Sequence, residues 1–92
     1  MSILARFAPR GTASTEQYDE SLRRLEEAGD FPPDGMEYHV AFLVDGNLRV
    51  SEIWDSREQM EAFGQRLMPV LDEIGIDAGE PEFLEIYNIV RR

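Results

Sequence analysis

The dipeptide Asp45-Gly46 lies between two mostly apolar runs, residues 36–44 and 48–55. Asp-Gly in this position is the strongest short-range signal of a β-hairpin, because a type I′ turn needs positive φ angles at both central residues. Short apolar runs bounded by turn residues are typical of strands rather than helices. We therefore expect the centre of the chain to form two adjacent antiparallel strands.

The length of the turn decides which side chains of the hairpin face each other. A two-residue turn places His39 opposite Glu52, whereas a three-residue turn shifts every pair by one and places His39 opposite Ile53. We favour the two-residue turn. Its other pairs are Val44 with Asn47, Ala41 with Val50 and Glu37 with Trp54.

Three further segments precede or follow the hairpin at some distance from it. Apolar residues 2–7, which end at a Pro-Arg-Gly breaker, predict a short first strand, and residues 83–90 predict the last strand. The helical spacing of apolar residues predicts a helix over residues 14–28. Ser14 and Gln17 fit the capping box that stabilises the start of such a helix.

A second helix is expected directly after the hairpin. Pro69 lies inside its apolar pattern, so we expect a kink or a break near residues 67–68. Gly75 is expected to end the helix. Two capping boxes fit its start, Asp55 with Glu58 and Ser56 with Gln59.

The predicted order of elements is β-α-β-β-α-β, which is the order of ferredoxin-like folds. We therefore predict an α+β fold in which a four-stranded antiparallel sheet carries both helices on one face. The 92 residues are expected to form one such domain, residues 1–92.

Two of the predicted strands are apolar on both faces, although two helices can cover only one face of the sheet. In the strand over residues 36–44, for example, Phe42 lies on one face and Leu43 on the other. A chain of this length also buries a small core by itself. We therefore expect a homodimer that closes through the open sheet face and forms a dimeric α+β barrel.

The composition excludes several classes of protein. The chain has 19 acidic and 9 basic side chains and a net charge of −10, which argues against binding to nucleic acid or to an anionic membrane surface. The absence of cysteine excludes disulfides, thiolate metal sites and thiol nucleophiles. No apolar run is long enough for a signal peptide or a membrane span, so a cytoplasmic protein is expected.

Residues 48–63, with the sequence LRVSEIWDSREQMEAF, resemble the strand-to-helix junction of the dimeric α+β barrel superfamily. This superfamily includes the antibiotic-biosynthesis-type monooxygenases, and the resemblance extends over the chain through the order of its elements. It implies the ferredoxin-like fold and the dimer described above. Because members catalyse different reactions or none, the resemblance does not fix the function.

Two activities of the superfamily can be compared with this chain residue by residue. Haem-degrading members carry an Asn in the first strand and a Trp and a His in the second helix, where this chain has Arg6, Phe7 and Phe63 and no histidine. Haem degradation is therefore not expected. Cofactor-independent monooxygenases of the superfamily use Asn, Trp and Tyr side chains around an aromatic substrate. Side chains of these types here are Trp54, Tyr38, Tyr87 and Asn88.

His39 and Glu52 are the candidate catalytic residues. In the favoured register they face each other in mid-strand, either as a proton-transfer unit or as an ordinary buried polar pair. The candidate pocket residues are Trp54, Tyr38, Tyr87, Phe63 and Met60, of which Trp54 is also a natural packing residue. A single histidine, no cysteine and no glycine-rich phosphate loop predict neither a metal nor a cofactor.

Two classes of function are consistent with these residues. The first is a cofactor-independent monooxygenase-like enzyme that acts on a small, partly aromatic compound in a pocket between the sheet and the helices. The second is a non-catalytic dimeric module that binds a small ligand or a protein partner. A cavity that reaches His39 would favour the enzyme, and a filled interface would favour the module.

Overall fold

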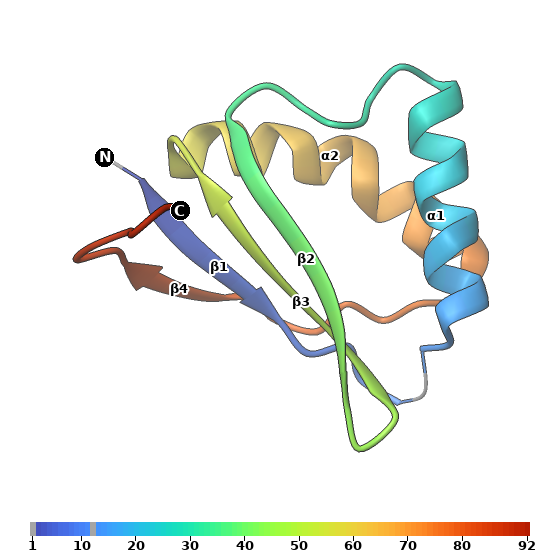
Figure 1. Ribbon diagram of the computed structural model, residues 1–92. Helices are drawn as coiled ribbons and strands as arrows, with labels where there is room; N and C mark the ends of the chain where they lie inside the picture. The colour runs from blue at the N-terminus through green and yellow to red at the C-terminus, as the bar shows by residue number, and fades with distance from the viewer. Residues whose placement is uncertain (1, 12) are drawn as a thin grey trace.

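Four strands and two helices form the fold of the protein, as seen in a computed structural model that describes residues 2–11 and 13–92 (Figure 1). The elements are β1 (Ile3–Phe7), α1 (Thr15–Glu27), β2 (Met36–Val44), β3 (Asn47–Trp54), α2 (Arg57–Ile74) and β4 (Glu82–Glu85). All pairs of neighbouring strands are antiparallel, in the order β2-β3-β1-β4. Both helices lie on the same face of the sheet. The predicted α+β, ferredoxin-like architecture is confirmed.

Both helices have a serine N-cap, whose hydroxyl can accept from an unpaired backbone amide of the first turn. Gly75 is the C-cap of α2 and Gly29 follows the C-cap of α1, and both adopt positive φ angles, which glycine does without strain. The Oγ of Ser14 accepts from the Gln17 amide, and the Gln17 side chain accepts from the Ser14 amide, as the capping box predicts. Of the two possible starts of α2, the structure has the one at Ser56, whose Oγ accepts from the Gln59 amide. Gly75 ends α2 with a φ of 91°.

The break that Pro69 predicts in α2 does not occur, since the helix is continuous from Arg57 to Ile74. Proline removes one backbone donor, which would otherwise bond to the carbonyl of Gln65. Both Pro69 and Gln65 are exposed, so water can solvate that carbonyl. The neighbouring Leu71 is buried against the rest of the protein. Burial of the apolar side of the helix therefore offsets the loss of one solvent-exposed hydrogen bond.

The hairpin has the predicted two-residue turn, with φ angles of 51° at Asp45 and 80° at Gly46. His39 pairs with Glu52, and the predicted pairs near the turn, Ala41 with Val50 and Val44 with Asn47, also form. The pairing of Glu37 with Trp54 was wrong, because the register shifts between Met36 and Tyr38 and Trp54 faces Met36 instead. A bulge of this kind adds one unpaired residue to one strand.

The last strand is shorter than predicted, ending at Glu85 rather than near residue 90. Glu85 pairs with Ile3, the first residue of β1, so β1 offers no further strand residue for pairing beyond this point. Residues 86–92 leave the sheet at the β4 edge and reach the opposite edge. There the Arg91 guanidinium donates to the Tyr38 hydroxyl at 2.8 Å and to the Glu37 carboxylate at 2.9 Å.

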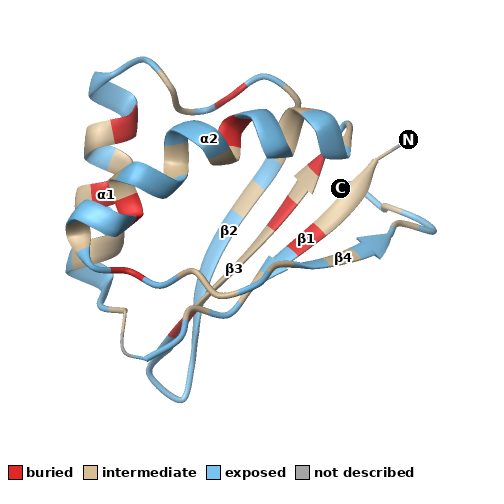
Figure 2. Cartoon of the chain, turned by 180° about the vertical axis from the view of Figure 1, so that it is seen from behind, coloured by how far each residue is buried: buried red, intermediate tan, exposed pale blue. Residues whose placement is uncertain are grey.

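The core lies between the sheet and the helices. Its buried side chains are those of Ala5, Leu25, Trp54 and Phe63. In Figure 2, buried positions lie on the strands at the centre of the sheet and on the helices, whereas much of β2 and β4 is exposed. Within the described residues, neither helix is long and apolar enough to cross a membrane.

The opposite face of the sheet carries an apolar row that no helix covers. Side chains alternate between faces along a strand, so Tyr38 points away from α1 while its neighbour His39 contacts that helix. Tyr38 pairs with Ile53, Ile53 with Leu4, and Leu4 with Leu84, which places one side chain from each strand on the open face. Val40, two residues further along β2, is 51% exposed. We call these five residues the open-face row.

Candidate functional site

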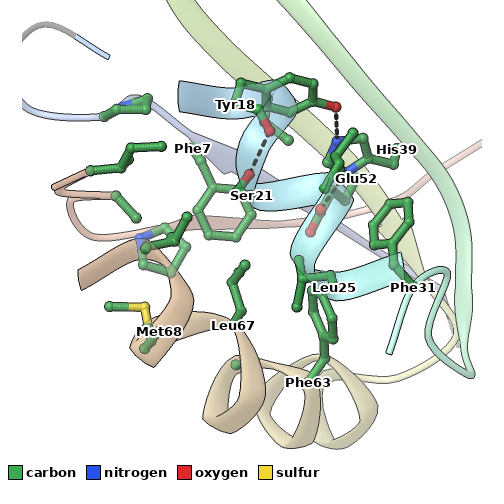
Figure 3. A pocket seen from close by; sticks show the side chains of 18 of the residues that line it. Phe7, Tyr18, Ser21, Leu25, Phe31, His39, Glu52, Phe63, Leu67 and Met68 are labelled. Atoms are coloured by element: carbon green, nitrogen blue, oxygen red, sulfur yellow. Dashed lines mark hydrogen bonds and ion pairs between the residues drawn. The ribbon is translucent and has the colours of Figure 1, made fainter. Parts of the chain in front are cut away.

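Four side chains form one hydrogen-bonded chain between the sheet and α1. The indole Nε1 of Trp54 donates to Glu52 Oε1 at 3.0 Å, and Glu52 Oε2 lies 2.6 Å from His39 Nδ1. On the other side of the imidazole, His39 Nε2 lies 2.7 Å from the hydroxyl of Tyr18. Figure 3 shows Tyr18, His39 and Glu52 in this sequence, with dashed lines between them.

The hairpin register and the pleat of the sheet bring three members of this chain together. His39 on β2 and Glu52 on β3 are directly paired, and both point toward the helices. Trp54 follows Glu52 by two residues and therefore lies on the same face of β3. Tyr18 comes from the first turns of α1, the helix that the Ser14 capping box starts.

The hydrogen bonds determine which nitrogen of His39 can act as a base. Glu52 is only 5% exposed, and each oxygen of its carboxylate has one donor, Trp54 or His39. Because a carboxylate only accepts, His39 carries a proton on Nδ1. In the neutral imidazole Nε2 is then free of a proton and accepts from the Tyr18 hydroxyl. Glu52 thus positions the ring with its basic nitrogen toward Tyr18.

Tyr18 is held in its protonated form. Burial raises the pKa of its phenol above the ordinary value, and the negative charges of Asp19 and Glu52 raise the pKa further. The hydroxyl therefore remains a hydrogen-bond donor over the physiological range of pH. A donor of this kind can receive a proton on its oxygen while it passes its own proton to Nε2.

A cavity of about 180 Å³ reaches these side chains from the space between the sheet and the helices. Its polar lining comes from Tyr18, Ser21, His39 and Glu52, and Ser21 uses its hydroxyl to donate to the Tyr18 carbonyl at 2.7 Å. Apolar side chains of both helices and of all the central strands supply most of the remaining surface. The site is thus a largely apolar chamber with one polar group of residues.

Two aromatic rings fix the position of the imidazole at the cavity. The Tyr18 ring lies nearly parallel to the His39 ring, at 17° and with centroids 5.9 Å apart, and Phe31 meets the same ring edge-on at 5.4 Å. Phe31 comes from the connector between α1 and β2 and also contacts Phe63 of α2. The orientation of His39 is therefore fixed by packing as well as by hydrogen bonds.

The structure brings together some of the residues that the sequence singled out and separates others. His39, Glu52, Met60 and Phe63 line the cavity. Trp54 is fully buried behind it and reaches it only through its hydrogen bond to Glu52.

The two remaining pocket candidates do not line this cavity. Tyr38 lies on the open sheet face, because its neighbour His39 takes the opposite face of the strand. Tyr87 follows the end of β4 and is fully exposed.

Tyr18 is the site residue that the sequence did not single out for chemistry, because its spacing with Leu22 and Leu25 indicates an ordinary apolar helix stripe. The available signal is chemical, since a buried tyrosine hydroxyl needs a partner and the chain has a single histidine to provide one nearby. Among the described residues, no group of three or more potential metal ligands lies together.

Comparison with known proteins finds similarity in structure and not in sequence. No protein-family model matches the chain, and no curated protein matches it. SnoaB, a cofactor-independent oxygenase from Streptomyces nogalater, superposes with a TM-score of 0.62 at 12% identity, covering 99% of this chain and 96% of that one. Rv0793 from Mycobacterium tuberculosis superposes with a TM-score of 0.56 at 18% identity, covering 98% and 97%.

A third similar structure is that of a protein assigned as an antibiotic biosynthesis monooxygenase from Deinococcus radiodurans. Its TM-score is 0.61 at 16% identity, and the match covers 100% of this chain and 98% of the other. At such identities the likeness establishes the fold, while function must be argued from the site itself. The chain therefore shares its ferredoxin-like fold with SnoaB, Rv0793 and the Deinococcus radiodurans protein.

Proposed function

We propose that the protein is a cofactor-independent monooxygenase-like enzyme that oxidises a small, partly aromatic compound in the cavity between the sheet and the helices. The observation that carries the proposal is the His39–Glu52 pair, whose unprotonated imidazole nitrogen accepts from Tyr18 beside a largely apolar cavity. An oriented base beside a largely apolar cavity suits proton removal from a weak acid. The oxygenase with a similar fold supports the reaction class.

Proton transfer is the part of the reaction that these side chains perform. A substrate phenol or enol donates its proton to the Tyr18 oxygen, while Tyr18 passes its own proton to His39 Nε2. The substrate becomes an anion, the imidazole becomes an imidazolium, and Tyr18 is regenerated. Glu52 stabilises the imidazolium through its 2.6 Å contact with Nδ1, and Trp54 holds the second oxygen of Glu52 in place.

Dioxygen is the oxidant and the second substrate. The electron-rich anion reduces O₂ and forms a carbon–oxygen bond with it, which gives a substrate peroxide. The imidazolium returns its proton to the distal oxygen, the O–O bond breaks, and water leaves with the hydrogen of the attacked carbon. For a phenol with a free para position the balance is phenol plus O₂ to quinone plus water, a four-electron oxidation that consumes the four-electron capacity of O₂.

The second part of the proposal is that the enzyme works as a homodimer through the open sheet face. The open-face row places apolar side chains from all four strands on the face without helices, and its members Tyr38, Val40 and Leu84 are exposed. Contiguous apolar surface of this kind on a soluble domain marks an interaction site. A second copy of the chain offers the same apolar face, so an isologous contact would bury both surfaces together.

Oxygen consumption tests the proposed reaction. With 2,6-dimethoxyphenol as the probe, the wild-type protein is expected to consume O₂ faster than a buffer blank and to form the quinone. His39→Gln is expected to reduce the rate at least about 100-fold, which is the usual contribution of a general base. Arg57→Gln, a change at an exposed α2 residue that does not line the cavity, serves as the matched control. Equal rates for wild type and His39→Gln would refute the proposal.

The alternative is a non-catalytic module that binds a small ligand, which the predominantly apolar lining of the cavity also suits. The same variants separate the two functions. A probe that binds to wild type and to His39→Gln with the same affinity, and is left unchanged in the presence of O₂, would establish the binding module instead.

A further inference from the structure

We infer that the cavity takes a single-ring compound that carries no negative charge and has one weakly acidic hydroxyl, and that Gly64 of α2 makes the room for its ring. The inference rests on the proposed function, because it places the hydroxyl of the ligand at Tyr18 and His39. The size of the ligand, its charge and the role of Gly64 in specificity are new, and they follow from the lining of the cavity.

The volume of the cavity limits the ligand to one ring. A cavity of roughly 150 Å³ lined by aliphatic and aromatic side chains accommodates benzene. The cavity here is about 180 Å³, so one ring with one or two small substituents fills it. A fused three-ring compound would need more space than the closely packed helices and sheet leave.

The lining also excludes ligands that carry a negative charge. Among the described residues, no arginine lines the cavity, whereas the buried carboxylate of Glu52 does. A carboxylate or phosphate on the ligand would lose its hydration without gaining a cationic partner, and burial of an unpaired charge is very costly. The net charge of −10 on the chain opposes the approach of anions as well.

The polar groups of the cavity are gathered around the imidazole, which sets the orientation of the ligand. In Figure 3, Tyr18, His39 and Glu52 lie together, and Met68 lies on the side of the cavity away from them. A ring hydroxyl can therefore be satisfied beside Tyr18, while the far end of the ring must be apolar. One weakly acidic hydroxyl matches this arrangement, and a second polar substituent at the far end does not.

Gly64 stands out because its helix would be more stable with another residue there. Glycine in a helix interior costs about 1 kcal/mol relative to alanine. Packing does not require the glycine, because an added Cβ would meet no atom within 4 Å. Gly64 lines the cavity and lies one helical turn from both Met60 and Met68, which line it too. Free space beside the ring is thus what the glycine provides.

Binding measured by ¹⁵N–¹H NMR titration tests the inference. The probes are 2-methylphenol, its carboxylated counterpart 2-hydroxybenzoate, and the three-ring compound anthrone. We expect 2-methylphenol to shift the resonances of cavity residues, and 2-hydroxybenzoate and anthrone to bind at least tenfold more weakly. Gly64→Leu is expected to weaken 2-methylphenol at least tenfold and to raise the midpoint of thermal unfolding or leave it unchanged. Ala62→Leu, on the exposed side of the same helix, is the control and should bind like wild type.

The outcomes separate the inference from the proposed function. Equal or tighter binding of 2-hydroxybenzoate or anthrone, wild-type affinity in Gly64→Leu, or no binding of 2-methylphenol at all would overturn the inference. Binding of 2-methylphenol that depends on Gly64, without O₂ consumption on 2,6-dimethoxyphenol, would support the inference and count against the proposed reaction.

Discussion

Replacing Glu52 by glutamine separates the positioning of His39 from its packing. The amide oxygen of Gln can accept from Trp54 Nε1 at the 3.0 Å contact, and the amide nitrogen then faces His39 Nδ1 at the 2.6 Å contact. The opposite orientation would set two donors against each other at Trp54. His39 Nδ1 must therefore become the acceptor, and the ring proton moves to Nε2.

Substitutions of Glu52 are expected to change the unfolding free energy and the turnover rate by different amounts. Glu52→Gln turns charge-assisted bonds into neutral ones, which costs about 1–2 kcal/mol of unfolding free energy. Glu52→Leu leaves both Trp54 Nε1 and His39 Nδ1 without a partner in a buried site and costs about 2–6 kcal/mol. Turnover should fall at least about 100-fold in Glu52→Gln, because a wrong histidine tautomer removes the base, as in serine proteases.

Two assays read these effects on separate scales. Urea unfolding followed by the fluorescence of Trp54, the only tryptophan, measures stability. The ¹⁵N chemical shifts of His39, the only histidine, report which ring nitrogen carries the proton without any need for assignment among several rings. If Nδ1 remains protonated in Glu52→Gln, or if this variant is as unstable as Glu52→Leu, Glu52 does not orient the imidazole and the reasoning fails.

Three further predictions concern the turn, the dimer and the phenol. Gly46→Val should cost more than about 0.5 kcal/mol in urea unfolding, because a β-branched residue resists the φ of 80°; a smaller loss would contradict the turn assignment. Sedimentation at micromolar concentration should give a species twice the 10.6 kDa chain mass, and Val40→Asp should yield folded monomers; a stable wild-type monomer would exclude the dimer. The raised pKa of Tyr18 stabilises the fold fully below the unfolded value of 10.0, and this contribution is lost as pH rises through the folded pKa. Stability should thus decline above pH 10 more steeply in wild type than in Tyr18→Phe, and identical pH profiles would show that the phenol is not buried as described.

The sequence predicted the parts of the fold that local chemistry determines. Asp45-Gly46 specified the turn, and the turn specified the pairing of His39 with Glu52. The sequence did not predict features of a strand that depend on the neighbouring strand. The bulge at Glu37 is a feature of the pairing of β2 with β3, and the early end of β4 follows from where β1 begins. No spacing within residues 36–44 or 83–90 reveals either.

The candidate site also has a part that local sequence determines and a part that depends on tertiary packing. The periodicity of the sequence could therefore predict only some of its residues. His39 and Glu52 meet through a register only 13 residues apart in the chain, whereas Tyr18 meets His39 through the docking of α1 onto the sheet. That docking depends on the whole core, so the sequence alone indicates only that Tyr18 lies on the apolar face of its helix. The cavity is harder still, because it is a volume that no side chain fills. The one sequence feature that points to the cavity is Gly64. This glycine destabilises the helix relative to alanine, and no neighbouring atom requires it, so its role is to leave space in the cavity.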